Sequence, residues 1–172
     1  MSQELPWSHA VTDIPAGGLS GQRTATAAER AAVVSALELA GCGKIGAKYR
    51  VTPLGGGRYR LAGEVTAEVE QPCIVTLEPV ASRLHERFDV EFWPEGEVEP
   101  QQEGEAEALS AAEIEPIEDG RIDAGRIVFE TIAAGLDPFP RKEGASLERS
   151  EAGGEGVPGP FAALEKLRGK TP

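Results

Sequence analysis

Four side chains in this 172-residue sequence are of the types that most often bind metal ions or act as nucleophiles. They are Cys42, Cys73, His9 and His85. A structural zinc site needs about four Cys, His or carboxylate ligands and usually contains a close pair such as C-x-x-C. No two of these four residues lie at such a spacing, so the sequence predicts no metal site and no cofactor.

Cys73 lies in the stretch "QPCIVTLEPV" (71–80) and could also be a nucleophile. A reactive cysteine requires a neighbouring base and a lowered pKa, and no residue near Cys73 in the sequence supplies either. The apolar residues that follow it are typical of a strand, which is interrupted at Glu78-Pro79. We therefore interpret Cys73 as a small buried residue on a strand.

Motifs for other kinds of catalysis are missing from the sequence. It contains no P-loop, no dinucleotide-binding glycine fingerprint and no G-x-S-x-G nucleophile elbow. The stretch "EDGRID" (118–123) lacks the spaced oxygen ligands and the terminal glutamate of a calcium loop. Asp123 is explained more simply as a helix N-cap. The sequence therefore predicts a protein that is not an enzyme.

The net charge of −12 argues against phosphate binding, but it comes mainly from one segment. Residues 95–119 contain ten acidic residues and no basic one, and the other 19 acidic residues nearly balance the 17 basic ones. The acidic segment is also poor in large apolar residues. Its composition predicts a disordered loop.

Residues 44–69 predict an antiparallel hairpin, because apolar and polar residues alternate on both sides of three consecutive glycines. Centring the turn on Gly56 places Lys48 opposite Glu64, and Lys44 opposite Glu68. Cross-strand ion pairs therefore explain these two lysines.

Three arginines near the turn have no partner in this register, and we predict that they contact phosphates. They are Arg50, Arg58 and Arg60. Arg141 and Lys142 form a second small basic spot, for which we predict the same role. Together these five residues are the candidate RNA-binding residues.

The elements that position these side chains follow from periodicity and capping signals. Thr26-Ala-Ala-Glu29 is a capping box that begins a helix from about 27 to 41, after an expected loop at 16–24. A short strand is expected within 6–14, and two more at 73–80 and 83–93. A second helix follows Asp123 and ends near Gly135.

These patterns predict an α+β fold. Its centre is a small antiparallel sheet or partly closed barrel of about four to five strands, with two flanking helices and a short C-terminal helix. The domain covers 1–142, a linker covers 143–159 and the C-terminal helix covers 160–169. Phe161, Leu164 and Leu167 share one face of that helix. It is too short to be stable alone, so we expect it to dock on this protein or on a partner.

The sequence gives no sign of export or of membrane insertion. No apolar run approaches the roughly 18–20 residues of a membrane helix. The stretch "MSQELPWSHAV" lacks the basic and apolar regions of a secretory signal. Two cysteines do not make a disulfide framework. We expect a cytoplasmic protein without a membrane partner, and its oligomeric state stays open.

The order of the segments resembles the YceD-like family, described as large ribosomal RNA subunit accumulation proteins. The resemblance is carried by "GEVTAEVEQPCIVTLEPV", an alternating "FDVEF", an acidic stretch, "EPIEDGRIDAGRIVFETIAAGLDPFPRKEGA" and "PFAALEKLR". It runs from about residue 5 to 168 and looks most like the alphaproteobacterial branch, where the cysteine is followed by V-T-L-E-P. The family markers are Cys73, Leu77, Glu78 and Pro79. Many relatives carry further cysteines where Phe139-Pro140-Arg141-Lys142 stands here, so no metal role is carried over.

The resemblance implies a bacterial, cytoplasmic and non-enzymatic ribosome biogenesis factor. Such a factor supports the synthesis, processing or accumulation of large-subunit (23S) ribosomal RNA. Its expected partner is that rRNA or its precursor, contacted directly or through a ribosomal protein or a nuclease. The alternative is a protein–protein adaptor that acts through the acidic loop at 95–119 and the C-terminal helix.

Overall fold

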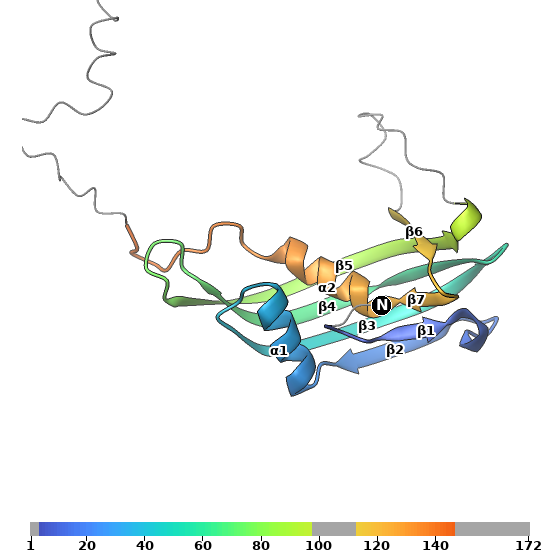
Figure 1. Ribbon diagram of the computed structural model, residues 1–172, viewed down its shortest axis with the longest axis horizontal. Coiled ribbons are helices and arrows are strands. Elements are labelled where there is room, and N and C mark those ends of the chain that lie inside the picture. Colours follow the sequence, from blue (N-terminus) through green and yellow to red (C-terminus); the bar gives the residue numbers. More distant parts are fainter. Residues whose placement is uncertain (1–3, 98–112, 147–172) are drawn as a thin grey trace, which may run out of the picture.

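The centre of the computed structural model is a five-stranded sheet with the order β2-β3-β4-β5-β6 (Figure 1). The structure describes residues 4–97 and 113–146. The strands are β2 (Leu19–Thr24), β3 (Gly41–Gly55), β4 (Arg58–Pro72), β5 (Pro79–Pro94) and β6 (Glu113–Ile117). Neighbours from β2 to β5 are antiparallel, whereas β6 joins β5 in parallel. The predicted α+β class is confirmed, and the sheet is open and mixed.

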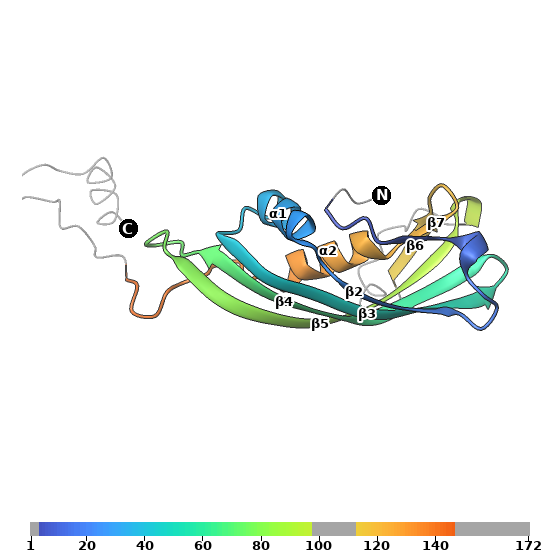
Figure 2. The ribbon, with the colours of Figure 1, turned by 90° about the horizontal axis from the view of Figure 1, so that it is seen from below.

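The remaining described elements lie on one face of this sheet. They are β1 (Ser8–Ala10), η1 (Val11–Asp13), α1 (Ala27–Ala36), η2 (Glu95–Glu97), β7 (Arg121–Asp123) and α2 (Ala124–Gly135). β1 and β7 pair antiparallel as a separate two-stranded sheet. Figure 2 shows both helices and this small sheet on the concave side of the curved large sheet. None of the described elements covers the opposite face, which we call the outer face.

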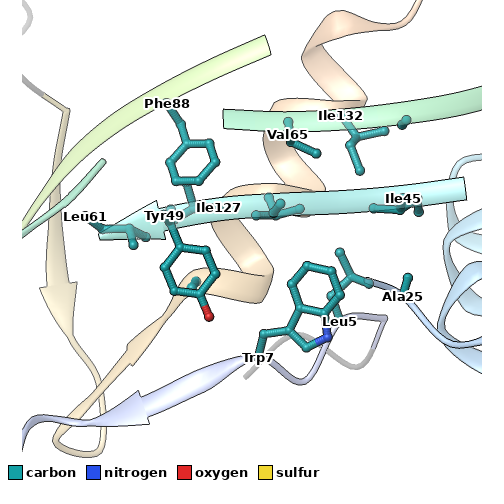
Figure 3. Close-up of a cluster of buried hydrophobic side chains, with 14 of the residues drawn as sticks. Leu5, Trp7, Ala25, Ile45, Tyr49, Leu61, Val65, Phe88, Ile127 and Ile132 are labelled. Carbon is teal, nitrogen blue, oxygen red and sulfur yellow. The ribbon is translucent and has the colours of Figure 1, made fainter. Parts of the chain in front are cut away.

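The hydrophobic core lies between the large sheet and the elements above it (Figure 3). Alternate residues of β3, β4 and β5 point into it, as the period of two requires. Among them are Ile45, Tyr49, Leu61, Val65 and Phe88. The second helix contributes the buried Ile127 and Ile132, and the N-terminal segment contributes Leu5 and Trp7. The apolar period therefore decides which face of each strand is left for solvent.

Several local predictions are confirmed. The hairpin has the predicted register, with Lys48 opposite Glu64 and Lys44 opposite Glu68. Positive φ angles at Gly55, Gly56 and Gly57 close its turn. Thr26 and Glu29 form the predicted capping box of α1, and Asp123 caps α2 through a hydrogen bond from the Arg126 amide.

The predicted loop at 16–24 is wrong, because most of it forms the edge strand β2. Its apolar content is low, so no alternation marks it in the sequence. Gly21 permits the pairing: a Cβ there would lie 2.5 Å from the Tyr49 ring. The first helix also ends earlier than predicted, at Ala36, because Glu38 adopts a positive φ of 52°.

The predicted strand at 73–80 is also wrong. Residues 73–78 form the loop between β4 and β5, and β5 then runs without interruption from Pro79 to Pro94. The described parts of the acidic segment are ordered, since η2 and β6 fall within 95–119. Residues 98–112 lie outside the described part. So do most of the predicted linker and the C-terminal helix at 160–169.

Candidate nucleic-acid interface

The outer face carries charged side chains in rows that cross three strands. One row joins Lys44, Glu68 and Arg83, and the next charged row joins Lys48, Glu64 and Arg87. In each row the middle strand, β4, supplies the acid, and both neighbours supply bases. The acids of β4 can therefore pair with either side, and the structure decides which.

Both glutamates pair with β5. Arg83 Nη2 lies 3.2 Å from Glu68 Oε1, and His85 Nε2 lies 3.3 Å from Glu64 Oε2. Neither Lys44 nor Lys48 forms an ion pair with any residue in the described ranges. The predicted register is correct, but the lysine ion pairs inferred from it are not formed.

A stripe of basic side chains that form no ion pair with any described residue therefore follows β3. We call Lys44, Lys48 and Arg50 the basic stripe. All three side chains are exposed. Arg50 donates to Gly17 O (2.7 Å) and to Ser20 Oγ (3.4 Å), which are both neutral acceptors, so its charge is retained. The three residues span about 20 Å of an exposed strand.

A shallow hollow lies beside the stripe and adds basic groups to it. Its volume is about 270 Å³, and its charged lining is Lys44, Glu68, Arg83 and His85. Arg87, on the same face of β5, makes no ion pair within the described part of the chain. Phosphate oxygens accept hydrogen bonds from such cationic donors. The middle of the outer face is thus the part best suited to an anion.

The hairpin tip is different, because its arginines are already neutralised. Arg58 Nη2 lies 2.8 Å from Glu97 Oε2, and the Arg58 guanidinium stacks 3.9 Å above the Trp93 ring. Arg60 forms a two-pronged ion pair with Asp89 of β5, with 2.7 Å between Nε and Oδ1. This pair lowers the pKa of Asp89.

Our inference that Arg58 and Arg60 lack partners is therefore wrong. Their partners come from β5 and from the turn after it, and the hairpin register alone cannot show them. A hollow of about 400 Å³ at the tip is lined by Arg58 together with Glu91 and Glu97, so it is acidic on balance. Of the three predicted arginines, only Arg50 keeps an uncompensated charge.

Arg141 and Lys142 lie at the other end of the sheet, beside the loop between β4 and β5. The 15 residues of β4 separate this end from the hairpin tip by about 45 Å. Lys142 Nζ donates to Glu78 Oε2 (2.9 Å), whereas Arg141 is exposed. The five predicted RNA-binding residues thus fall into two separate groups.

Cys73 is fully enclosed at this second end of the sheet. Its sulfur accepts hydrogen bonds from the backbone amides of Val75 and Lys142, both at 3.4 Å. Hydrogen bonds from the Thr76 side chain, then from the Lys142 and Thr76 amides, lower the pKa of the Cys73 thiol to about 6, while burial acts in the opposite direction. The cysteine joins two loops, and its enclosure keeps reagents from the sulfur.

Other sites for ligands find less support in the described ranges. No cluster of three or more His, Cys, Asp or Glu side chains is placed to hold a metal ion within residues 4–97 and 113–146. A hollow of about 660 Å³ between β5 and α2 is lined by the carboxylates of Glu86, Asp89, Glu113 and Glu130 and by one arginine, so it repels phosphate. No helix in these ranges is long and apolar enough to cross a membrane.

The middle of the outer face was not predicted from the sequence. The hairpin register placed Lys44 and Lys48 in ion pairs, and Arg83 and Arg87 were given no role. The sequence does contain a signal for it. The strand after β4 carries basic residues at 83, 85 and 87, and β4 carries acidic residues at 64 and 68; in each strand the even spacing keeps them on one face. That signal requires knowing that β5 pairs with β4 in this register.

Comparison with known proteins gives one family. A family model described as "Large ribosomal RNA subunit accumulation protein YceD" matches residues 61–168, which is more than half of the chain. The match begins in β4 and continues beyond the described residues. No curated protein and no solved structure matches the chain significantly.

Proposed function

Because the chain belongs to the YceD family of large ribosomal RNA subunit accumulation proteins, we propose that it supports this accumulation by binding the RNA directly. The RNA is the large-subunit (23S) rRNA or its precursor, and the contact is made in the bacterial cytoplasm. The binding surface is the outer face, with the basic stripe at its centre.

One observation carries this proposal. Glu68, which could neutralise Lys44, forms its ion pair with Arg83 instead, and the Glu64 carboxylate lies against His85 and not against Lys48. Lys44, Lys48 and Arg50 are left as an exposed row on a sheet face that no described element covers. Backbone phosphates supply most of the affinity of such a surface, and cations in a row follow the path of a nucleic-acid strand.

The other predicted residues have secondary roles in this proposal. Arg60 lies on the same face as the stripe, and its ion pair with Asp89 is exposed to solvent, where salt screens the attraction between charges. A phosphate can therefore replace the carboxylate there, and at Arg58 too. Arg141 and Lys142 provide a separate contact, at the far end of the sheet.

We also propose that the protein has no catalytic activity. Within the described part, no hydrogen bond joins a cysteine to a histidine, and Cys73 is enclosed. The stabilising effect on RNA then comes from binding alone, since a bound surface is inaccessible to nucleases.

Depletion of the protein tests the function itself. We expect a lower ratio of large-subunit to small-subunit rRNA, with precursor or fragments of the larger RNA, measured by gel electrophoresis and sequencing of RNA ends. Restoring the protein should restore the ratio. Unchanged rRNA and normal subunit profiles would overturn the proposed function.

Charge removal tests the direct contact. The triple variant Lys44→Gln, Lys48→Gln and Arg50→Gln should bind rRNA more weakly than the wild type. The slope of log K against log salt should become less negative by about 2, because each lost contact with single-stranded RNA accounts for about 0.7. The control is Lys44→Arg, Lys48→Arg and Arg50→Lys, which keeps every charge. Equal affinity and slope in the neutral variant would exclude this surface.

The adaptor is the second candidate, and the geometry around 98–112 makes it testable. The described chain ends at Glu97 in η2 and resumes at Glu113, which pairs with Val90 on β5. Replacing 98–112 by a short Gly-Ser linker therefore leaves the sheet complete. If the shortened protein still binds rRNA but fails to support its accumulation, the acidic segment recruits a protein partner. Retained accumulation would argue against the adaptor.

A further inference from the structure

Two loops that are far apart in the sequence form one end of the molecule. One is residues 73–78, between β4 and β5, and the other is residues 136–142, after α2. They lie side by side in both views of the ribbon (Figures 1 and 2). We call this end of the molecule the apolar tip, for the three side chains described below.

Hydrogen bonds hold the two loops together. Ile74 N donates to Pro140 O (2.9 Å), and Lys142 N donates to the Cys73 sulfur (3.4 Å). The Gln71 carboxamide and the Asp137 backbone exchange two more hydrogen bonds. Within the first loop, Leu77 N donates to Cys73 O (2.9 Å). The tip is therefore fixed by the fold before any partner binds.

This fixed tip presents large apolar side chains to solvent. Leu77 is 77% exposed, Phe139 is 69% exposed and Ile74 is 46% exposed. Leu77 also has a φ of 61°, which is rare for a side chain with a Cβ. Large apolar side chains that are exposed on two loops held together in this way are candidates for an interaction site. Among the described residues, the only other exposed large apolar side chain is Leu54, at the hairpin end.

We propose that residues 160–169 of the same chain dock on the apolar tip. The path of the chain supports this occupant. Lys142 is bonded to Cys73 and Glu78 within the tip, and the described residues end at Ser146, four positions later. The 14 residues from Ser146 to Pro160 can span at most about 50 Å, and the described chain ends beside the tip, so residues 160–169 are within reach of it.

The sequence of the segment fits this surface. Phe161, Leu164 and Leu167 recur at a spacing of three, which predicts one apolar side of a helix too short to be stable alone. Docking would therefore remove apolar surface from water on both the segment and the apolar tip. Because the segment is tethered, its effective concentration at the tip is in the millimolar range, and a weak contact suffices.

Hydrogen–deuterium exchange on the full chain tests the proposal from both sides. Residues 160–169 should be protected in the wild type, and Leu77→Asp with Phe139→Asp should abolish that protection. Conversely, Leu164→Asp should raise the exchange rate of residues 73–78. Leu54→Asp is the matched control, since it adds the same charge at an exposed leucine at the other end of the sheet. It should leave both rates unchanged.

Three results would overturn the proposal. The first is that residues 160–169 of the wild type exchange as fast as an unstructured peptide. The second is that their protection survives in the double Asp variant while its core strands keep wild-type protection. The third is that protection appears only on raising the protein concentration, which would make a second copy the occupant. If the double Asp variant loses the protection of its core strands, the exchange rate of residues 73–78 in Leu164→Asp is the deciding measurement, and an unchanged rate there would overturn the proposal.

Discussion

The side-chain carboxamide of Gln71 exchanges two hydrogen bonds with the backbone of Asp137, which lies 66 residues later in the sequence. Gln71 Nε2 donates to Asp137 O (2.8 Å), and Asp137 N donates to Gln71 Oε1 (3.2 Å). Gln71, 8% exposed, is the buried polar side chain at the end of β4. It satisfies the backbone where the chain leaves α2 and thereby fixes the segment that carries Phe139.

Replacing Gln71 with Ala should lower the free energy of unfolding by about 1–3 kcal/mol, because the Asp137 N–H and C=O groups lose their partners. Urea unfolding measures this, and hydrogen exchange at residues 137–142 should rise. The neighbouring exposed residue provides a control: Glu70→Ala should change stability by less than about 0.5 kcal/mol. Equal unfolding midpoints for the two variants would contradict the role assigned to Gln71.

Gly125→Ala should destabilise the protein by about 1–3 kcal/mol or more, although alanine is normally better than glycine in a helix by up to about 1 kcal/mol. The reason is a collision: a Cβ on Gly125 would lie 1.7 Å from Leu5 O. The helix and the N-terminal segment would have to separate, and the hydrogen bond from Gly125 N to Trp7 O (3.0 Å) would be lost.

Thermal unfolding of Gly125→Ala should show the loss. Gly46→Ala is the control, because the nearest atom to its added Cβ is 3.6 Å away. A Gly125→Ala protein as stable as the wild type would show that the N-terminal segment does not pack on α2 in this way.

The Cys73 thiol should make stability depend on pH. Its pKa is lowered from 9.0 to about 6 in the folded protein, so the folded state releases the proton more readily than the unfolded state. The resulting stabilisation is fully present above about pH 9 and is lost as the pH falls through about 6. Between these values the stability of the wild type should rise with pH more than that of Cys73→Ser.

Urea unfolding across this pH range measures the difference, and taking the difference cancels other titrating groups such as His9. Ultraviolet absorbance of the thiolate reports the same titration directly. Parallel stability curves for the wild type and Cys73→Ser would mean that the thiol keeps its proton in the folded protein.

Glu64→Gln with Glu68→Gln should strengthen rRNA binding, because the outer face loses two negative charges and Arg83 is released from its ion pair with Glu68. The gain should be larger at low salt, since exposed charges are screened as ionic strength rises. Filter binding or fluorescence anisotropy at several salt concentrations measures it. Glu38→Gln and Glu118→Gln remove the same charge at exposed positions outside β3, β4 and β5, and an equal gain from that control would point to net charge alone.

Local rules decided a good part of this fold. The capping box of α1, the N-cap of α2 and the glycine turn of the hairpin each involve residues close in sequence, so propensity and hydrogen-bonding chemistry predict them. The hairpin register follows too, because its two strands are joined by one short turn. For the same reason the sequence correctly placed Lys48 opposite Glu64.

The tertiary structure decided what the sequence left open. Whether Glu64 bonds to Lys48 or to His85 depends on the strand on the other side of β4, and sequence distance does not reveal which strand that is. β2 and β6 are edge strands in which apolar and polar residues alternate only weakly. They form because they pair with long neighbouring strands, and their own strand propensity would not be enough.

Cys73 shows the same division. Its sequence context predicted a small buried residue, and burial is correct. Cys73 lies in a loop, and its sulfur accepts a hydrogen bond from the Lys142 amide, 69 residues later in the sequence. Both features depend on the path of the chain after α2. Short-range chemistry fixed the individual elements, whereas long-range packing decided which charges on the outer face stay uncompensated and which apolar side chains gather at the tip.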